Sequence, residues 1–160
     1  MSKSKPVKTS PSEAERVNEK KWGKPLMAAG WTAIPNTLLD HQQQLGLDAV
    51  NLNILLQIAK HWWYPDQAPY PGKKALARRI GVSPRTIQRR LRAMVGAKLI
   101  TRKPRRKKGG GNDTTEFYFK GLIARATPYA EEKLKVIKTR KEEDAARERR
   151  RGLRLVRADE

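Results

Sequence analysis

Arginine, glutamine and threonine side chains recur on one side of a short segment after Ser83-Pro84, and together they offer hydrogen bonds to nucleic acid. A serine before a proline predicts a helix start, because the hydroxyl caps the helix and proline fits its first position. At about 100° per residue, Ile87 and Leu91 share one face and the polar residues point away from it. Guanidinium and amide groups suit guanine and adenine edges as well as phosphates. We predict that five residues contact DNA bases: Arg85, Thr86, Gln88, Arg89 and Arg92.

Positive charge dominates the surrounding sequence. The stretch from Lys73 to Lys108 contains fifteen Lys or Arg and no Asp or Glu. Solvated helices normally mix their charges, because opposite charges one turn apart support a helix and like charges weaken it. A polyanion is therefore the expected neighbour, in agreement with a net charge of +20 for the chain. The alternative, an ordinary solvated face, does not explain the missing acidic partners.

Two helices joined by a tight turn are predicted to position these cations. Leu76, Ala77 and Ile80 form the apolar side of the first helix, which ends at Gly81. A glycine-containing turn between two such helices has the spacing of a helix-turn-helix. The cations of the first helix and the capping serine are predicted to contact the DNA backbone: Lys73, Lys74, Arg78, Arg79 and Ser83.

A β-hairpin is predicted next, with strands from Leu99 to Arg106 and from Thr114 to Gly121. Residues 107–113 include three glycines and Asn-Asp, which favour a turn. Phe117 and Phe119 are expected on the same face of the second strand. The hairpin cations are predicted to contact the DNA backbone or a narrow minor groove: Arg102, Lys103, Arg105, Arg106, Lys107 and Lys108. A flexible, solubilising linker is the alternative interpretation.

The segment Leu76-Ala77-Arg78-Arg79-Ile80-Gly81-Val82-Ser83-Pro84-Arg85-Thr86-Ile87-Gln88-Arg89-Arg90-Leu91 resembles the winged helix-turn-helix domains of bacterial, plasmid and phage DNA-binding proteins. The resemblance extends from Trp31-Thr32-Ala33-Ile34-Pro35 to Phe117-Tyr118-Phe119. It implies a mainly α fold with a small β-hairpin wing (α+β), and binding of double-stranded DNA. Repressors, replication initiators and partition factors share this pattern, so it does not distinguish among them.

The segment before the motif is expected to supply the core. Trp31 to Ile34 suggests a short edge strand that stops at Pro35, and a helical turn follows to Leu39. Asp48 is a plausible N-cap for a densely apolar helix that runs to about Trp62. Tyr70, in a turn-rich segment, is expected to pack inward.

The aromatic run His61-Trp62-Trp63-Tyr64 allows two interpretations. Packing at the end of the core helix is favoured, because Trp62 continues the apolar period of that helix. Stacking on unpaired nucleic-acid bases is the alternative.

The chain is divided into three segments by composition. Residues 1–25 form a basic leader that is predicted to be disordered, because it has too few apolar residues to offset its ordering entropy. Residues 26–126 form the winged helix-turn-helix domain. Thr127-Pro128 predicts the start of a charged C-terminal helix, and residues 127–160 comprise this helix and a frayed tail. The helix lacks sustained coiled-coil heptads.

The sequence offers no pattern for catalysis, a metal or a cofactor. It has no cysteine and two histidines, and its acidic residues are scattered in the expected domain. Neither a secretory signal nor a membrane-spanning stretch is present, and a bacterial cytoplasmic location near nucleoid or plasmid is expected. We interpret the chain as a non-enzyme.

Three hypotheses follow. The leading one is a duplex DNA-binding protein in transcription regulation or replication initiation of a bacterial, plasmid or phage replicon. The second is an RNA or single-strand binder that stacks bases on its aromatic run. The third is a DNA-bound adaptor whose C-terminal helix binds a replication or partition protein, or a second copy of the chain.

Overall fold

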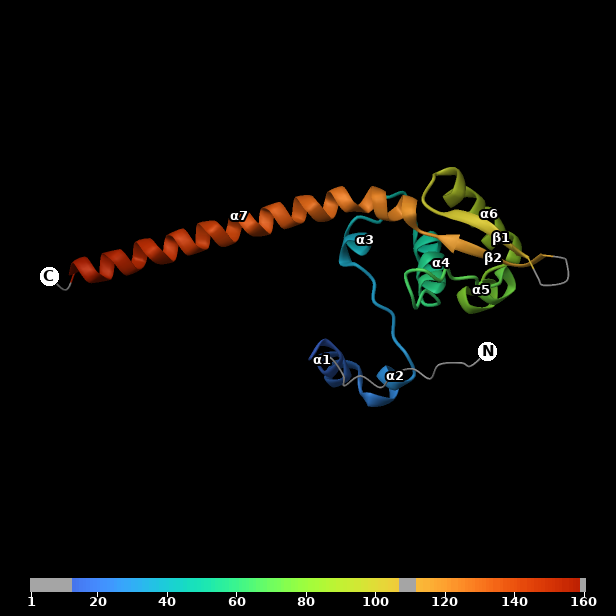
Figure 1. Ribbon diagram of the computed structural model, residues 1–160, viewed down its shortest axis with the longest axis horizontal. Helices are drawn as coiled ribbons and strands as arrows, with labels where there is room; N and C mark the ends of the chain where they lie inside the picture. Colours follow the sequence, from blue (N-terminus) through green and yellow to red (C-terminus); the bar gives the residue numbers. More distant parts are fainter. Residues whose placement is uncertain (1–12, 107–111, 159–160) are drawn as a thin grey trace. The chain divides into compact units, whose positions relative to one another are not determined.

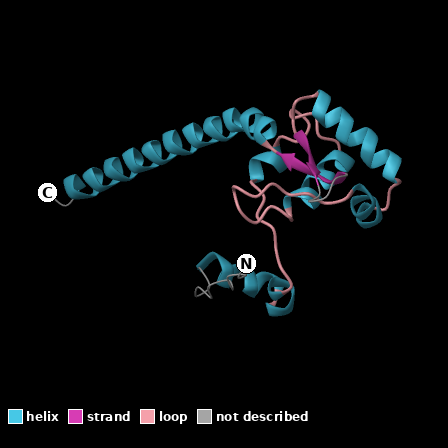
Figure 2. Cartoon of the chain, turned by 45° about the vertical axis from the view of Figure 1, so that its right-hand side comes forward, coloured by secondary structure: helices cyan, strands magenta, loops and turns pink. Residues whose placement is uncertain are grey.

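The computed structural model describes residues 13–106 and 112–158. Its contacts divide the chain into two compact units, Met1–Ala33 and Ile34–Glu160. The described elements are mostly helices, with one antiparallel pair of strands (Figures 1 and 2). The predicted fold class, mainly α with a β-hairpin wing, is confirmed. Among the described helices, none combines the length and apolar character needed to cross a lipid bilayer.

The first unit contains two short helices, α1 (Glu13–Trp22) and α2 (Lys24–Ala28). The predicted disorder of residues 1–25 is therefore wrong for residues 13–22, and residues 1–12 lie outside the described part. Acidic residues begin α1 and two lysines end it, an arrangement that complements the helix dipole. Neither helix buries a side chain.

The second unit begins with α3 (Asn36–Asp40), which confirms the predicted helical turn after Pro35. The edge strand predicted from Trp31 to Ile34 is wrong, because this segment has no strand beside it to pair with in the described structure. The loop after α3 contributes to the core, since Leu45 and Leu47 are both buried there.

The central helix of the second unit is α4 (Ala49–Ala59). The predicted N-cap is confirmed: the Asp48 carboxylate accepts a hydrogen bond from the Asn51 backbone N–H at 2.8 Å. The helix ends before its predicted end near Trp62. There the Trp62 N–H donates to the carbonyl of Ala59, three residues back, so the last turn tightens and the chain leaves the helix.

The helix-turn-helix consists of α5 (Lys73–Ile80) and α6 (Pro84–Gly96). Gly81 ends α5 in the left-handed region at φ 78°, a conformation in which a side chain is strained. The Ser83 hydroxyl begins α6 by accepting a hydrogen bond from the Thr86 N–H at 3.0 Å. The predicted helix phase is confirmed by its buried residues, Ile87, Leu91 and Met94.

The wing is a hairpin of β1 (Thr101–Arg106) and β2 (Asn112–Tyr118). Its register pairs Arg102 with Phe117, and an irregularity interrupts the ladder between Pro104 and Arg106. Phe117 and Phe119, predicted to lie on the same face, are both buried in the core. β1 begins two residues later than predicted, and β2 runs from Asn112 to Tyr118 rather than from Thr114 to Gly121. Residues 112 and 113 of the predicted turn therefore belong to the strand, and residues 107–111 lie outside the described residues.

The segment before α5 is attached to the hairpin by a hydrogen bond from the Phe117 N–H to the Pro69 carbonyl at 2.9 Å. Pro69 is buried, whereas Tyr70 is 49% exposed. The prediction that Tyr70 packs inward is therefore wrong. Successive residues of an extended chain point to opposite sides, and Pro69 takes the inward side.

The last helix, α7 (Lys120–Ala158), begins before its predicted start at Thr127-Pro128. Its early start depends on Gly121, where a Cβ atom would lie 1.8 Å from the Lys98 carbonyl oxygen. This close approach lets the Leu122 N–H donate to the Leu99 carbonyl at 2.7 Å. Pro128 lies inside the helix, although proline has no N–H to donate.

Candidate nucleic-acid interface

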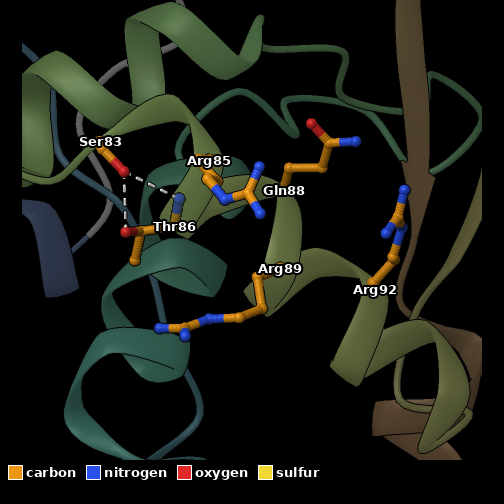
Figure 3. Close-up of a pocket in the computed structure, with 6 residues that line it drawn as sticks. All are labelled: Ser83, Arg85, Thr86, Gln88, Arg89 and Arg92. Carbon is orange, nitrogen blue, oxygen red and sulfur yellow. Dashed lines mark hydrogen bonds between the residues drawn. The ribbon is translucent and has the colours of Figure 1, made fainter.

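The outer face of α6 carries four exposed polar side chains, those of Arg85, Gln88, Arg89 and Arg92. They line one open hollow together with Ser83 and Thr86 (Figure 3). Within the described part of the chain, none of the four donates a hydrogen bond to another residue or forms an ion pair. The buried face of α6 explains this exposure, because it points the remaining positions away from the core.

The other two residues of the hollow form the cap of α6. The dashed lines in Figure 3 join Ser83 Oγ to the Thr86 backbone nitrogen at 3.0 Å and to Thr86 Oγ1 at 2.9 Å. Thr86 is half-buried. Its hydroxyl is thus held at the helix start, where uncompensated N–H groups and the helix dipole favour an anion.

Arg90 differs from the neighbouring arginines of α6. Its guanidinium donates to the Asp48 carboxylate, in an ion pair between α6 and the cap of α4. Arg90 was not among the predicted DNA-contacting residues, although at about 100° per residue it lies about 60° from Ile87 on the helical wheel, beside the buried face. Arg90 is therefore a contact between helices rather than a free cation.

The predicted backbone-contacting cations of α5, Lys73, Lys74, Arg78 and Arg79, are all exposed. Arg79 already has a partner, because its Nη1 donates to His61 Nε2 at 2.8 Å. Burial, then the charges of Arg79 and Lys60, lower the pKa of His61 below its ordinary value of 6.5. The neutral ring can accept this hydrogen bond.

Two of the predicted wing cations lie over aromatic rings. The Lys103 ammonium is 5.3 Å from the centre of the Tyr118 ring, and the Arg105 guanidinium is 4.2 Å from that of Tyr70. Such contacts orient a cation without neutralising it. Arg102 is half-buried beside the N-terminus of α5, where it lines a hollow with Lys73.

The remaining predicted wing residues are only partly placed. Arg106 is the last residue of β1. Lys107 and Lys108 lie outside the described residues, so their predicted role stays a prediction.

The acidic residue opposite Lys103 in the hairpin is already bonded. Glu116, which pairs with Lys103 in the strand register, accepts a hydrogen bond from the Tyr118 hydroxyl at 2.8 Å. This bond is the first cause of the raised pKa of Tyr118, ahead of burial and the charge of Glu116. The Tyr118 hydroxyl therefore keeps its proton, and the Glu116 carboxylate accepts a hydrogen bond from within the hairpin.

The start of α7 is held against the domain by contacts that leave the α6 face open. The rings of His41 and Tyr129 stack with centres 4.5 Å apart, and Lys133 Nζ lies 2.9 Å from the Asp40 carboxylate. The hydrogen bond from Lys133 is the main cause of a lowered Asp40 pKa. Within the described ranges, no group of three or more His, Cys, Asp or Glu side chains is arranged to hold a metal ion.

Residues 45–100, which comprise the central helix and both motif helices, match a family model described as a helix-turn-helix domain. The chain carries a helix-turn-helix domain. The matched segment ends just before the hairpin, and the hairpin adds the wing of a winged helix-turn-helix domain. The predicted resemblance to winged helix-turn-helix domains is thus confirmed.

Three solved structures resemble the chain, each at low sequence identity. A possible transcriptional regulator from Methanosarcina mazei is 20% identical, with a TM-score of 0.37 over 59% of this chain and 80% of that one. RV1404 from Mycobacterium tuberculosis is 17% identical, with a TM-score of 0.42 over 82% and 83%. A multiple antibiotic-resistance repressor (MarR) from Listeria monocytogenes is 16% identical, with a TM-score of 0.36 over 92% and 98%.

These identities and scores are too low to transfer a function to this chain. No curated protein matches it in sequence.

Proposed function

We propose that the protein binds duplex DNA by placing the exposed face of α6 in the major groove. The observation that carries the proposal is the set of four exposed polar side chains on α6, three of them arginines, with no partner in the described chain. A free guanidinium can bond guanine O6 and N7 with two parallel hydrogen bonds, and a glutamine amide can do the same at adenine N6 and N7. The base-contacting set is Arg85, Thr86, Gln88, Arg89 and Arg92.

The supporting contacts are assigned to phosphates. Lys73, Lys74 and Arg78 are exposed cations on α5, the helix that lies across the backbone in helix-turn-helix docking. Ser83 stands at the start of α6, where N–H groups attract a phosphate. Arg79 can join them, since its bond to His61 occupies only part of its donor capacity.

The wing is assigned to the adjacent backbone or minor groove. Lys103 and Arg105 are held over aromatic rings and stay charged, and Arg102 lies beside α5. Arg106, Lys107 and Lys108 extend the same run of cations in sequence. Phosphate contacts of this kind fix the position of the protein on DNA, while base contacts select the sequence.

In biological terms, we propose regulation of transcription or initiation of replication on a bacterial, plasmid or phage replicon. The test is selection of bound duplexes from a random pool at two salt concentrations, followed by affinity measurements on the selected site. Enrichment of a defined sequence supports base contacts by α6. A pool that stays random while binding weakens with salt contradicts them, since it indicates backbone contacts alone.

A second function, recruitment of a protein partner, is favoured by the surface of α7. Leu134 and Ile137 are 64% and 41% exposed and lie one turn apart, so they form a short apolar strip on the helix. Every residue from 131 to 150 is exposed. The partner is a second copy of the chain or a replication or partition protein. Replacing both Leu134 and Ile137 with serine removes this strip and keeps the Tyr129 and Lys133 contacts. The adaptor hypothesis expects lost activity in cells with duplex affinity retained.

A further inference from the structure

A hollow with a volume of about 290 Å³ is lined by the loop that joins α4 to α5, and it shares no residue with the α6 face. It is lined by His61, Trp63, Gln67, Ala68, Tyr70 and Pro71. This volume is near the lower end of the range for small-molecule sites, about 300 to 1,000 Å³. It therefore suits a single planar group better than an extended ligand.

The aromatic side chains at this hollow are exposed to an unusual degree for a folded domain. Trp63 is 68% exposed and Tyr70 is 49% exposed, whereas the neighbouring Trp62 packs against Phe119 with ring centres 5.4 Å apart. The favoured interpretation of the aromatic run is thus confirmed for Trp62. Among the described residues, the Trp63 ring stacks on no other aromatic ring, so it is available to a ligand.

The backbone around the hollow is fixed in advance. The Gln67 N–H closes a turn on the Tyr64 carbonyl at 3.1 Å, and the Pro69 carbonyl is bonded to the hairpin at 2.9 Å. Pro71 restricts the chain further. A preorganised site loses less conformational entropy on binding, so exposed rings held in this way bind a flat partner at lower cost.

The charge at the edges of the hollow is positive. Arg79 bonds the His61 side chain at 2.8 Å, and Arg105 lies 4.2 Å from the centre of the Tyr70 ring. No carboxylate lines the hollow. Aromatic faces bordered by cations match a nucleotide, in which a flat base is attached to a negative phosphate. The amide of Gln67 adds a donor and an acceptor for a base edge.

We propose that this hollow binds one unpaired nucleobase of a nucleic-acid strand, stacked on Trp63, with the adjacent phosphates close to Arg79 and Arg105. The site would hold a single-stranded tail or a displaced base next to the duplex on α6. The residues that line it are distinct from those of the α6 face, whereas Arg79 and Arg105 at its edges can also contact the duplex backbone.

The test compares three DNA ligands with the full chain: a blunt duplex, the same duplex with a short single-stranded tail, and one whose tail has abasic sugars in place of nucleotides. The last two carry the same phosphates and differ only in the bases. We expect the base-bearing tail to bind about tenfold more tightly than the abasic tail. Trp63→Ala should remove this difference and Trp63→Phe should retain it, with blunt-duplex affinity unchanged in both.

Trp22→Ala is the matched control, because Trp22 is 67% exposed and lies in the other unit. Equal binding of the two tails by the unaltered protein overturns the proposal, and this is also the result expected if the hollow binds a peptide. A base preference that survives Trp63→Ala, or that Trp22→Ala also removes, overturns it as well. Blunt-duplex affinity reports on the α6, α5 and wing contacts without an unpaired base, so failure of the duplex-binding model is seen separately.

Discussion

The carboxylate of Asp48 joins the start of α4 to the middle of α6 through its two oxygens. Oδ1 accepts the backbone N–H of Asn51 at 2.8 Å, and Oδ2 accepts the guanidinium of Arg90. The same side chain thus caps the core helix and fixes the helix proposed to enter DNA. Asp48 pairs with Arg90 and leaves Arg89, the exposed neighbour in the sequence, without this contact.

Two substitutions of Asp48 distinguish the contribution of the helix cap to stability from that of the ion pair. Asp48→Ala loses both, and we expect a loss of about 1 kcal/mol or slightly more in unfolding free energy, typical of a lost N-cap. Asp48→Asn keeps an oxygen for the cap and loses only the charge. Because the pair is partly exposed, that variant should lose less than about 1 kcal/mol. Urea unfolding measures both, and an Asn variant as unstable as the Ala variant would contradict the cap assignment.

Arg89 and Arg90 form a matched pair for DNA recognition. Arg89→Ala should cost about 1–3 kcal/mol on a selected site and relax the preference at one base position. Arg90→Ala should lower thermal stability while leaving the relative preference among DNA sequences unchanged. Fluorescence anisotropy on a panel of single-base variants measures both effects. The docking model fails if Arg89→Ala has no effect on any duplex.

Leu91 tests the phase of α6. It is 1% exposed, so Leu91→Ala should lower the unfolding free energy by about 2–5 kcal/mol, through lost burial and the cavity left behind. Arg92→Ala, the next position, points outward and should change stability by no more than about 0.5 kcal/mol. Denaturant unfolding followed by circular dichroism measures the difference.

Lys103 tests the wing. Lys103→Ala should remove one phosphate contact. Binding to all duplexes should then weaken by a similar factor, and the slope of log affinity against log salt should decrease by about one unit. Lys138→Ala removes the same charge from α7, where the side chain is 80% exposed. It serves as the control. Equal effects of the two substitutions would indicate that only net charge matters, which argues against a wing contact.

His61 should titrate below its ordinary pKa of 6.5, because burial and then the charges of Arg79 and Lys60 disfavour its protonated form. The unfolded chain then binds more protons than the folded chain just below pH 6.5. The stability from the neutral ring is therefore complete above that pH and decreases as the pH falls through this window. Arg79→Ala should move the pKa back upward. NMR titration measures it, with the His61 signal identified by its loss in His61→Gln; an unchanged pKa contradicts the Arg79 contact.

Local signals predicted the helix-turn-helix well because its elements are defined by neighbouring residues. Ser83-Pro84 begins α6, Gly81 ends α5, and the apolar period of Ile87 and Leu91 faces the core. Each depends on capping, φ preference or helix period, and these properties extend over only a few residues. The exposed face of α6 followed from the same period.

Contacts between distant segments could not be predicted in this way. The start of α7 was placed at Thr127-Pro128, since a cap and proline are the usual local signals. The helix begins instead at Lys120, because Gly121 permits close approach to Lys98. α1 is helical although it has few apolar residues, because its acidic first turn and basic last turn complement the helix dipole. Composition alone does not show this order of charges.

The sequence by itself determined that a cationic, aliphatic-backed helix follows a glycine turn, since helix period and capping are properties of adjacent residues. Only the tertiary structure decided which cations remain free. Arg90 and Arg79 look like their neighbours in the sequence, but one meets Asp48 and the other meets His61 once the helices pack. These pairings depend on which distant side chains the core brings together, and the position of a residue along the chain does not specify them.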